Sequence, residues 1–144
     1  MKLSIAADHG GFILKKEIVK YLKAAGHELD DKGVFSEESV DYPDFAIKVA
    51  NDVASGKAEH GILICGTGIG MSITANKIKG IRAALAYDEY TSEMSRKHNN
   101  ANVLCMGGRT TTPDMAKKIL DVWFSTDFER DRHQRRIDKI SALE

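Results

Sequence analysis

The segment Cys65–Gly70, with the sequence CysGlyThrGlyIleGly, holds the residues whose types and spacing are best suited to chemistry. A thiol follows the continuous apolar run 61–64 and precedes three glycines. Glycines let a backbone turn tightly around a ligand, and amides at a helix start can hold an anion or a developing oxyanion. The same amides favour the thiolate form of Cys65, which would make it a base or nucleophile. The alternative is a tight turn beside an inert, buried thiol.

The spacing of these glycines excludes two common nucleotide loops. Gly66, Gly68 and Gly70 do not form the GxGxxG pattern of dinucleotide-binding domains, and the phosphate loop GxxxxGK[ST] is absent from the chain. The segment is therefore predicted to approach a small ligand of another kind.

Two further segments end apolar runs in polar or glycine residues. Asp8–Gly11 follows the run 3–7, and Gly107–Arg109 follows the run 103–106. Ligands of open parallel sheets bind outside the carboxyl ends of the strands, so both segments are expected to converge with Cys65–Gly70. The alternatives are helix capping for Asp8 and a solvated surface position for His9.

Basic side chains near the end of the chain form a candidate phosphate site. Arg132 and Arg136 are four residues apart and share one face of a predicted helix, which suits two forked donors to a phosphate dianion. A solvated face paired with neighbouring acidic residues is the alternative. His98 follows another predicted helix, where a histidine is more often a solvated helix-end residue. Nucleic-acid binding is disfavoured because the basic cluster is short and has no aromatic platform.

Apolar runs and helical periods alternate along the whole chain. Strands are expected at 3–7, 27–31, 61–65, 81–87 and 103–106, and helices at 12–25, 43–54, 71–78, 89–97, 113–124 and 131–143. This order predicts parallel βαβ units with right-handed crossovers. The fold class is therefore α/β: a three-layer α/β/α sandwich with a Rossmann-like, doubly wound parallel sheet of about five strands, in which 61–65 is central.

Composition limits the possible partners. The 144 residues suit a single domain, 1–144, and 42% of them are hydrophobic. The 21 basic and 21 acidic residues cancel, so the chain has no global attraction for nucleic acid or anionic membranes. The two cysteines, Cys65 and Cys105, have no metal-type spacing, and Cys105 is expected in the core. With neither a signal peptide nor a membrane span predicted, the expected compartment is the cytoplasm.

Taken together, the motifs resemble those of the type B ribose-5-phosphate isomerase family, within the larger group that includes the galactose-6-phosphate isomerase subunits. The resemblance covers essentially the whole chain. It rests on AlaAspHisGlyGly near the start, ValAspTyrProAsp at 40–44, GlyIleLeuIleCysGlyThrGlyIleGly at 61–70, AlaAsnLys at 75–77, GlyIleArgAla at 80–83, SerArgLysHisAsnAsnAlaAsn at 95–102 and ArgHisGlnArgArg at 132–136.

The resemblance implies catalytic roles for four side chains. Cys65 would remove the proton beside the carbonyl and return it to the neighbouring carbon. Thr67 would hydrogen-bond the reacting oxygens, and His98, helped by Asp8, would open the sugar ring. Backbone amides of the glycine-rich loop would stabilise the enediolate; they are those of Gly66, Thr67, Gly68, Ile69 and Gly70.

The resemblance also implies how substrate is held. Asn99 would hold sugar or loop oxygens. Apart from the resemblance, the choice of sugar is expected to depend on loop shape around residues such as Tyr42 and Ser72, and simple packing is the alternative for both. Phosphate would be bound by His9, Arg109, Arg132 and Arg136. The helix 131–143 would pack at the interface of a homodimer with shared active sites, which could pair into a tetramer. This chemistry requires neither a cofactor nor a metal.

The implied activity is interconversion of D-ribose 5-phosphate and D-ribulose 5-phosphate through an enediolate, in the non-oxidative pentose phosphate pathway. Isomerisation of a six-carbon sugar phosphate, allose 6-phosphate or galactose 6-phosphate, is an alternative with the same chemistry. An alternative of another class is a non-catalytic sensor that binds sugar phosphates without turnover.

Overall fold

The computed structural model describes residues 1–144 and contains five strands and six helices. The strands are β1 (Lys2–Ala7), β2 (Glu28–Asp31), β3 (His60–Cys65), β4 (Ala83–Leu85) and β5 (Val103–Gly107); the helices are α1 (Phe12–Ala24), α2 (Tyr42–Ala54), α3 (Ile69–Ala75), α4 (Glu89–Lys97), α5 (Pro113–Ser125) and α6 (Asp131–Ser141). All strands form one parallel sheet in the order β2-β1-β3-β5-β4. The predicted α/β fold with a central β3 is confirmed.

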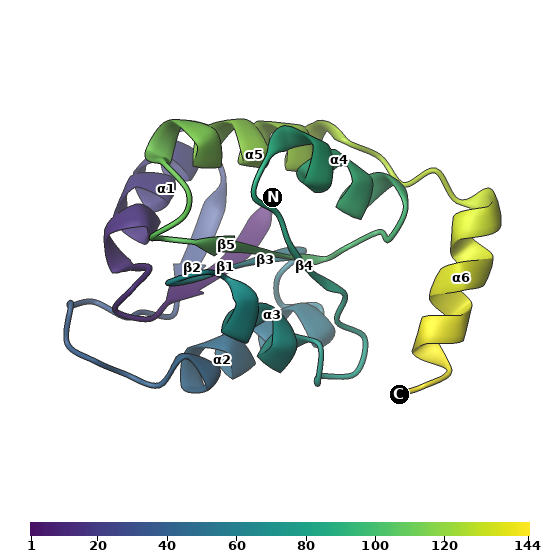
Figure 1. Ribbon diagram of the computed structural model, residues 1–144, viewed down its shortest axis with the longest axis horizontal. Helices are drawn as coiled ribbons and strands as arrows, with labels where there is room; N and C mark the ends of the chain where they lie inside the picture. The colour runs from purple at the N-terminus through teal and green to yellow at the C-terminus, as the bar shows by residue number, and fades with distance from the viewer.

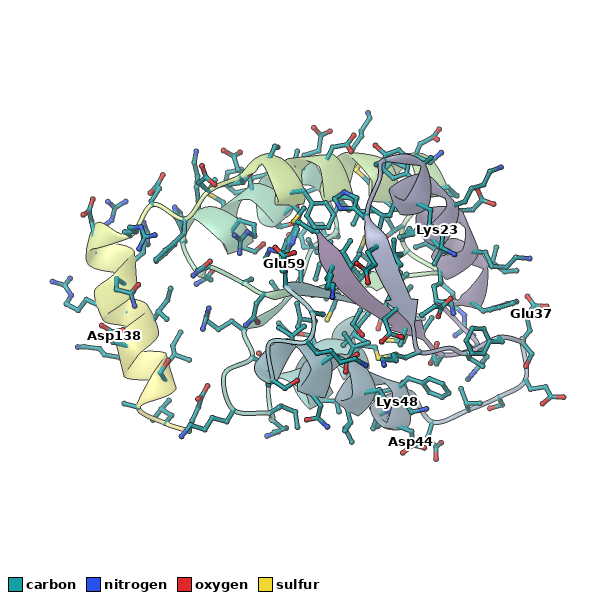
Figure 2. The ribbon with its side chains drawn as sticks, turned by 180° about the vertical axis from the view of Figure 1, so that it is seen from behind. Lys23, Glu37, Asp44, Lys48, Glu59 and Asp138 are labelled. Atoms are coloured by element: carbon teal, nitrogen blue, oxygen red, sulfur yellow. The ribbon has the colours of Figure 1, made fainter.

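The helices form a layer on each side of the sheet. Helices α1, α4 and α5 cover one face and α2 and α3 the other, whereas α6 stands apart at the end of the chain (Figure 1). Charged side chains such as Lys23, Glu37 and Asp138 lie on the outside of the molecule (Figure 2). None of the helices is both long and apolar enough to cross a membrane.

The core lies on both faces of β3. Successive side chains of a strand point to opposite faces. Accordingly Ile62 and Ile64 join the buried cluster beneath α1 and α5, while Leu63 and Cys65 join the cluster beneath α2 and α3. Burial on both faces explains why the run 61–65 contains no polar residue. Cys105 is fully buried in the second cluster, as predicted.

Two predicted elements are shorter or shifted in the structure. The strand expected at 81–87 pairs only over Ala83–Leu85, at the sheet edge. There the Asn76 side chain binds the amide and carbonyl of Ala83, at 2.8 and 2.9 Å, which occupies the outward-facing groups of the edge strand. The helix expected at 71–78 is α3, Ile69–Ala75, because Gly68 adopts a left-handed conformation (φ 80°) directly before its first turn.

The topology defines two opposite edges of the sheet. The strand order reverses between β1 and β3, and the carboxyl ends of these strands lead into Asp8 and Gly66. Such a switch point opens a crevice at the carboxyl edge. The segment 98–102 joins the end of α4 to the start of β5, so it lies at the amino edge.

Candidate active site

Backbone hydrogen bonds join the three predicted loops at the carboxyl edge. The Asp8 amide donates to the Ile64 carbonyl at 3.1 Å, the Gly108 amide donates to the Cys65 carbonyl at 2.7 Å, and the Arg109 amide donates to the Gly66 carbonyl at 3.0 Å. The predicted convergence of these loops is therefore confirmed.

Glycines make this close approach possible. A Cβ on Gly108 would lie 2.3 Å from the Gly10 carbonyl oxygen, and a Cβ on Gly107 would lie 2.9 Å from the Thr67 Cα. Atoms cannot approach so closely, so side chains at these positions would separate the loops. The two glycines thus keep the backbone amides next to the end of β3.

Cys65 lies at the base of this cluster with 5% of its surface exposed. The Gly68 amide donates a hydrogen bond to its Sγ at 3.2 Å. This places a backbone N–H donor against the sulfur at the carboxyl end of the central strand. The left-handed Gly68 turn (φ 80°) provides this contact, so the thiol lies in the buried cluster beneath α2 and α3 but at its edge next to the glycine-rich loop.

The other side chains of the glycine-rich loop are more accessible. Thr67 is exposed, and its Oγ1 accepts a bond from the Ile69 amide at 3.3 Å. The Tyr42 ring, at the start of α2, packs on Gly70, where an added Cβ would lie within 2.5 Å of it. Tyr42 and Thr67 therefore both flank the loop that begins at Cys65.

Asp8 and His9 are held by the loops themselves. Asp8 is 6% exposed, and its Oδ1 accepts bonds from the amides of Gly10 and Gly11 at 2.9 and 3.2 Å. These bonds close a turn before α1, whose N-cap is Gly11 and receives no side-chain hydrogen bond, so Asp8 does not cap the helix. The Val40 amide donates to His9 Nδ1 at 3.2 Å, so the proton of the neutral ring lies on Nε2. His9 therefore offers an N–H donor outward.

These residues make up one part of the predicted site, which we call the thiol half-site. Arg109 belongs to it because its Nη1 would lie 3.1 Å from a Cβ placed on Gly66. The thiol half-site comprises Asp8, His9, Tyr42, Cys65, Gly66, Thr67, Gly68, Ile69, Gly70 and Arg109.

The remaining predicted residues lie at the amino edge, in what we call the histidine half-site: His98, Asn99, Arg132 and Arg136, together with Glu129 and His133. His98 is the C-cap residue of α4. The Asn99 carbonyl accepts a hydrogen bond at 3.0 Å from the side chain of Arg82, which lies just before β4. The length of β5 separates the two half-sites by about 13 Å at ~3.3 Å per residue. One chain therefore does not bring His98 and Cys65 together.

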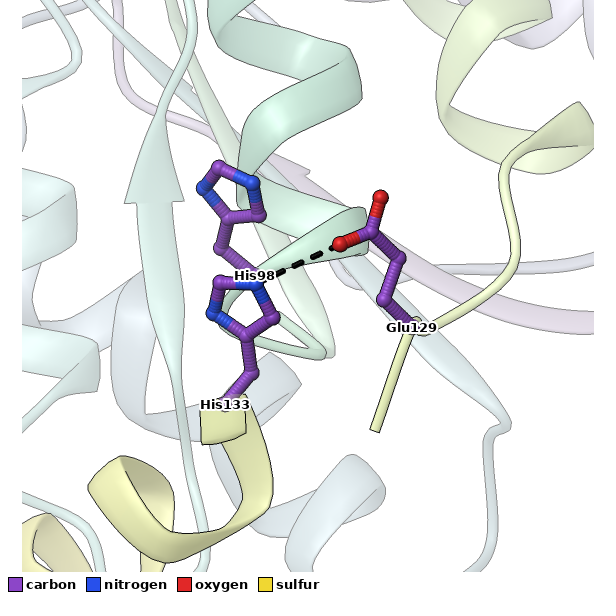
Figure 3. Close-up of side chains that lie close together, drawn as sticks. All are labelled: His98, Glu129 and His133. Atoms are coloured by element: carbon purple, nitrogen blue, oxygen red, sulfur yellow. Dashed lines mark ion pairs between the residues drawn. The ribbon is translucent and has the colours of Figure 1, made fainter. Parts of the chain in front are cut away.

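Side chains of the histidine half-site contact one another closely (Figure 3). The His98 and His133 rings are stacked, with centroids 4.2 Å apart and planes 11° from parallel. His133 Nε2 lies 3.3 Å from Glu129 Oε2. Burial, followed by the neighbouring His98 and Arg132, lowers the pKa of His133 below its ordinary value. The neutral ring is therefore favoured at His133.

The buried position of His133 was not predicted from the sequence, although the helical pattern indicates it. It lies one helical turn before Ile137, and both side chains are buried on the inner face of α6. The arginines Arg132 and Arg136 lie on the exposed side of the same helix. A histidine in register with an apolar residue indicates an inward position.

The histidine half-site also contains potential metal ligands. One donor atom each from His98, Glu129 and His133 lies within 4.8 Å of the others. However, a ring nitrogen binds metal through a lone pair in the ring plane, and nearly parallel planes direct the two lone pairs side by side rather than toward one point. The two rings therefore form a stacked pair whose nitrogen lone pairs do not converge on one point.

The chain is a doubly wound α/β domain with a thiol and a glycine-rich loop at its switch point, and it has no dinucleotide fingerprint. These features are those of Rossmann-like proteins that act on small ligands. More specifically, residues 3–140 match the model of the ribose/galactose isomerase family, and the chain belongs to that family. The family predicted from the motifs is thereby confirmed.

Individual relatives are similar over nearly their full length. Ribose-5-phosphate isomerase B of Escherichia coli is 48% identical over 99% of this chain and 96% of its own. The structure of ribose-5-phosphate isomerase B from Clostridium thermocellum gives a TM-score of 0.98 at 50% identity, covering 99% of this chain and 97% of that one. Ribose-5-phosphate isomerase B from Mycoplasma genitalium, solved with bound ribulose 5-phosphate, gives 0.94 at 45% identity, with coverage of 99% and 95%.

Proposed function

We propose that this protein is an aldose–ketose isomerase that interconverts D-ribose 5-phosphate and D-ribulose 5-phosphate through an enediolate. The observation that carries the proposal is the Gly68 amide donating to Cys65 Sγ at 3.2 Å, at the end of the central strand. The relatives named ribose-5-phosphate isomerase B, one of which holds ribulose 5-phosphate, support the choice of substrate. We also propose that the enzyme acts in the cytoplasm, in the non-oxidative pentose phosphate pathway.

In the proposed reaction, the Cys65 thiolate removes the proton from C2 of the open-chain aldose. The electrons form the C1–C2 double bond of an enediolate, and Cys65 then returns a proton to C1. A proton moves from O2 to O1, so atoms and charge balance. The exposed Thr67 hydroxyl and the loop amides are suited to stabilise the enediolate oxygens, and a preorganised donor contributes roughly 10²–10³-fold.

We further propose that the active site is completed by a second copy of the chain. His98 is the group suited to open the sugar ring, yet it lies on the order of 13 Å from Cys65 along the sheet of its own chain. In a symmetric dimer, the thiol half-site of each chain can meet the histidine half-site of its partner. Asp8 of one chain would then assist His98 of the other.

The surroundings of α6 support such a dimer. A cavity of about 630 Å³ separates the end of α6 from the segment leading into β4. Its wall includes Ile140 and Leu143, which are 47% and 88% exposed. An apolar helix face left open in this way is typical of a surface that another protein covers. We propose a second copy of this chain as the protein that covers this surface, because the histidine half-site lies on the same side of the molecule as α6.

Phosphate binding is divided between the half-sites. His9 offers its Nε2 proton, and Arg109 is exposed beside Gly66, both at the carboxyl edge. Arg132 and Arg136 project from α6 of the partner in the proposed dimer. Forked guanidinium donors suit a phosphate dianion. The binding energy of the phosphate, which is remote from the reacting carbons, would position the substrate.

A six-carbon sugar phosphate is the second candidate substrate, because the matched family includes galactose as well as ribose isomerases. A coupled assay of the purified protein with ribose, allose and galactose phosphates distinguishes the candidates. We expect the highest kcat/KM with ribose 5-phosphate. Binding of all three without turnover would instead indicate a sugar-phosphate sensor and contradict an isomerase.

Replacement of the thiol tests the proposed base. Cys65→Ala should fold and bind substrate but lose about 10²–10⁴-fold in kcat, the usual contribution of a positioned base. Cys105→Ala is the matched control, because its thiol is fully buried and burial raises its pKa above the ordinary value. Turnover of Cys65→Ala within a few fold of the wild type would contradict the role of the thiol.

Replacement of the arginines tests phosphate binding. Arg132→Ala or Arg136→Ala should weaken binding of phosphorylated sugars and leave the affinity for free sugars little changed. Calorimetry with ribose and ribose 5-phosphate measures both. Equal losses for the two ligands would argue against contact with phosphate.

A further inference from the structure

Two arginines hold the turn that carries His98. Arg82, just before β4, donates through Nε to the carbonyls of Asn99 and Asn100 at 3.0 and 3.1 Å, and through Nη2 to the Asn100 carbonyl at 3.0 Å. Arg96, on α4, donates through Nη1 to Asn100 Oδ1 at 3.1 Å and to the Ala101 carbonyl at 2.6 Å. Three consecutive carbonyls after the helix are thus bound by guanidinium groups.

The backbone of this turn is fixed from the other side as well. Asn100 has a positive φ of 43°, and its amide donates to the Arg96 carbonyl at 3.1 Å. The Ala101 amide donates to the Ser95 carbonyl at 3.0 Å. Carbonyls beyond a helix end have no partner within the helix, so the arginines supply the donors that would otherwise be missing. The turn has little freedom while both guanidinium groups are in place.

The charges of these arginines are not explained by ion pairing. Neither guanidinium lies within 4.0 Å of a carboxylate oxygen, although both side chains are half-buried. Arg96 lies over the Trp123 ring, 5.6 Å from its centroid. Burial lowers the pKa of each arginine, and proximity to Arg82 lowers that of Arg96 further. The contacts that offset the burial of the two charges are therefore the hydrogen bonds to the turn and, for Arg96, the Trp123 ring.

We propose that Arg82 and Arg96 are positioning residues for ring opening: they fix the turn 98–101 and so aim the His98 ring at the ring oxygen of the bound sugar. This inference rests on the proposed function. In the step, a proton leaves the C1 hydroxyl and a proton is delivered to the ring oxygen. The bond from C1 to the ring oxygen breaks and the C1 carbonyl forms. Stacking on His133 restrains the same ring from α6.

Ring opening can be measured separately from proton transfer at carbon by comparing two reactions: isomerisation of ribose 5-phosphate and hydrogen exchange of ribulose 5-phosphate. Ribose 5-phosphate is mainly cyclic and must open before it isomerises. Ribulose 5-phosphate cannot close a five-membered ring, because the oxygen on its C5 carries the phosphate. Deuterium incorporation at its C1 in D₂O, followed by NMR, therefore requires the enediolate chemistry of Cys65 but not ring opening.

Arg82→Lys retains the positive charge and loses the planar fork that reaches two carbonyls. At saturating substrate, isomerisation of ribose 5-phosphate should fall at least about tenfold, because small misplacements of a reacting group have large effects on rate. Deuterium incorporation into ribulose 5-phosphate should stay within about threefold of the wild type, since the thiol half-site is untouched. Arg96→Lys should show the same pattern.

The control is Val49→Ala, which removes buried atoms from α2 on the opposite face of the sheet. It should lower the melting temperature and leave the ratio of the two rates unchanged. If Arg82→Lys does not fold, Asn100→Gly decides the question: glycine accepts the positive φ, while the bond to Arg96 through Oδ1 is lost. The same selective loss of isomerisation is expected.

Equal loss of both rates in these variants, or loss of neither, would overturn the positioning role. A wild-type protein that catalyses neither reaction would instead overturn the proposed function. The two failures are therefore distinguishable.

Discussion

Mixed dimers provide the strongest test of a divided active site. Cys65 ends β3 at the carboxyl edge, whereas His98 follows α4 at the amino edge of the same sheet. A chain with Cys65→Ala lacks the proposed base and keeps an intact histidine half-site. A chain with His98→Asn lacks the proposed ring-opening group and keeps an intact thiol half-site. Each homodimer should therefore be nearly inactive with ribose 5-phosphate.

The expected recovery follows from the geometry of a two-fold dimer. In a mixed dimer, one active site contains both replacements, and the other combines Cys65 of one chain with His98 of its partner. One of the two sites is thus fully wild type. Random association of equal amounts gives about half mixed dimers, so the mixture should regain about one quarter of the wild-type activity per chain.

Co-expression of the two variants with different affinity tags gives the mixed dimer in pure form after two purification steps. Its activity in the coupled ribose 5-phosphate assay should be about half that of the wild type, since one of two sites works. The matched control is a dimer of two differently tagged Cys65→Ala chains, which should stay inactive.

The recovery distinguishes the two possible arrangements of the site. If the mixed dimer is no more active than its parent homodimers, Cys65 and His98 act within one chain. The reasoning from the two edges of the sheet would then be wrong. Size-exclusion chromatography of each sample shows whether dimers were present.

Two further predictions concern the scaffold. Lys15 is 2% exposed and lies 2.6 Å from Asp31, so Lys15→Met should lower the free energy of unfolding in urea by about 2 kcal/mol, less than for a fully buried pair because solvent reaches Asp31. Lys15→Met/Asp31→Asn should recover most of the loss; no recovery would argue against the ion pair. Burial lowers the pKa of His27 and His60 below their ordinary value of 6.5, so the unfolded chain takes up protons first on acidification. The free energy of unfolding should therefore fall as the pH drops below 6.5, and His27→Gln/His60→Gln should reduce this slope; an unchanged slope would refute the assignment.

Much of the fold follows from patterns that depend on local physics. The apolar run 61–65 is central because only a strand covered on both faces can dispense with polar residues. The convergence of Asp8–Gly11, Cys65–Gly70 and Gly107–Arg109 follows from parallel strands, whose carboxyl ends share one edge. By contrast, the short β4 depends on the Asn76 side chain binding the backbone of Ala83, a contact that periodicity does not reveal.

The division of the candidate site was only partly predictable. That His98 lies at the amino edge follows from the order of elements, because a helix that leads into a parallel strand ends where that strand begins. The stacking of His133 on His98 does not follow, because it depends on the path into α6. There Arg130 and Asp131 adopt positive φ values of 66° and 44°; aspartate occasionally takes this conformation, but the preferences of arginine do not predict it.

A single chain has complete hydrophobic cores, but its candidate active site is divided between two edges of the sheet. Both buried clusters are closed within one chain, and Trp123 at 1% exposure needs no partner to cover it. A parallel sheet nevertheless exposes its strand ends at two distant edges, so groups at both edges can act on one small substrate only across an interface. In the proposed dimer, dilution should therefore abolish isomerisation before it unfolds the chain. Association of the two chains, rather than folding of each one, would complete the active site.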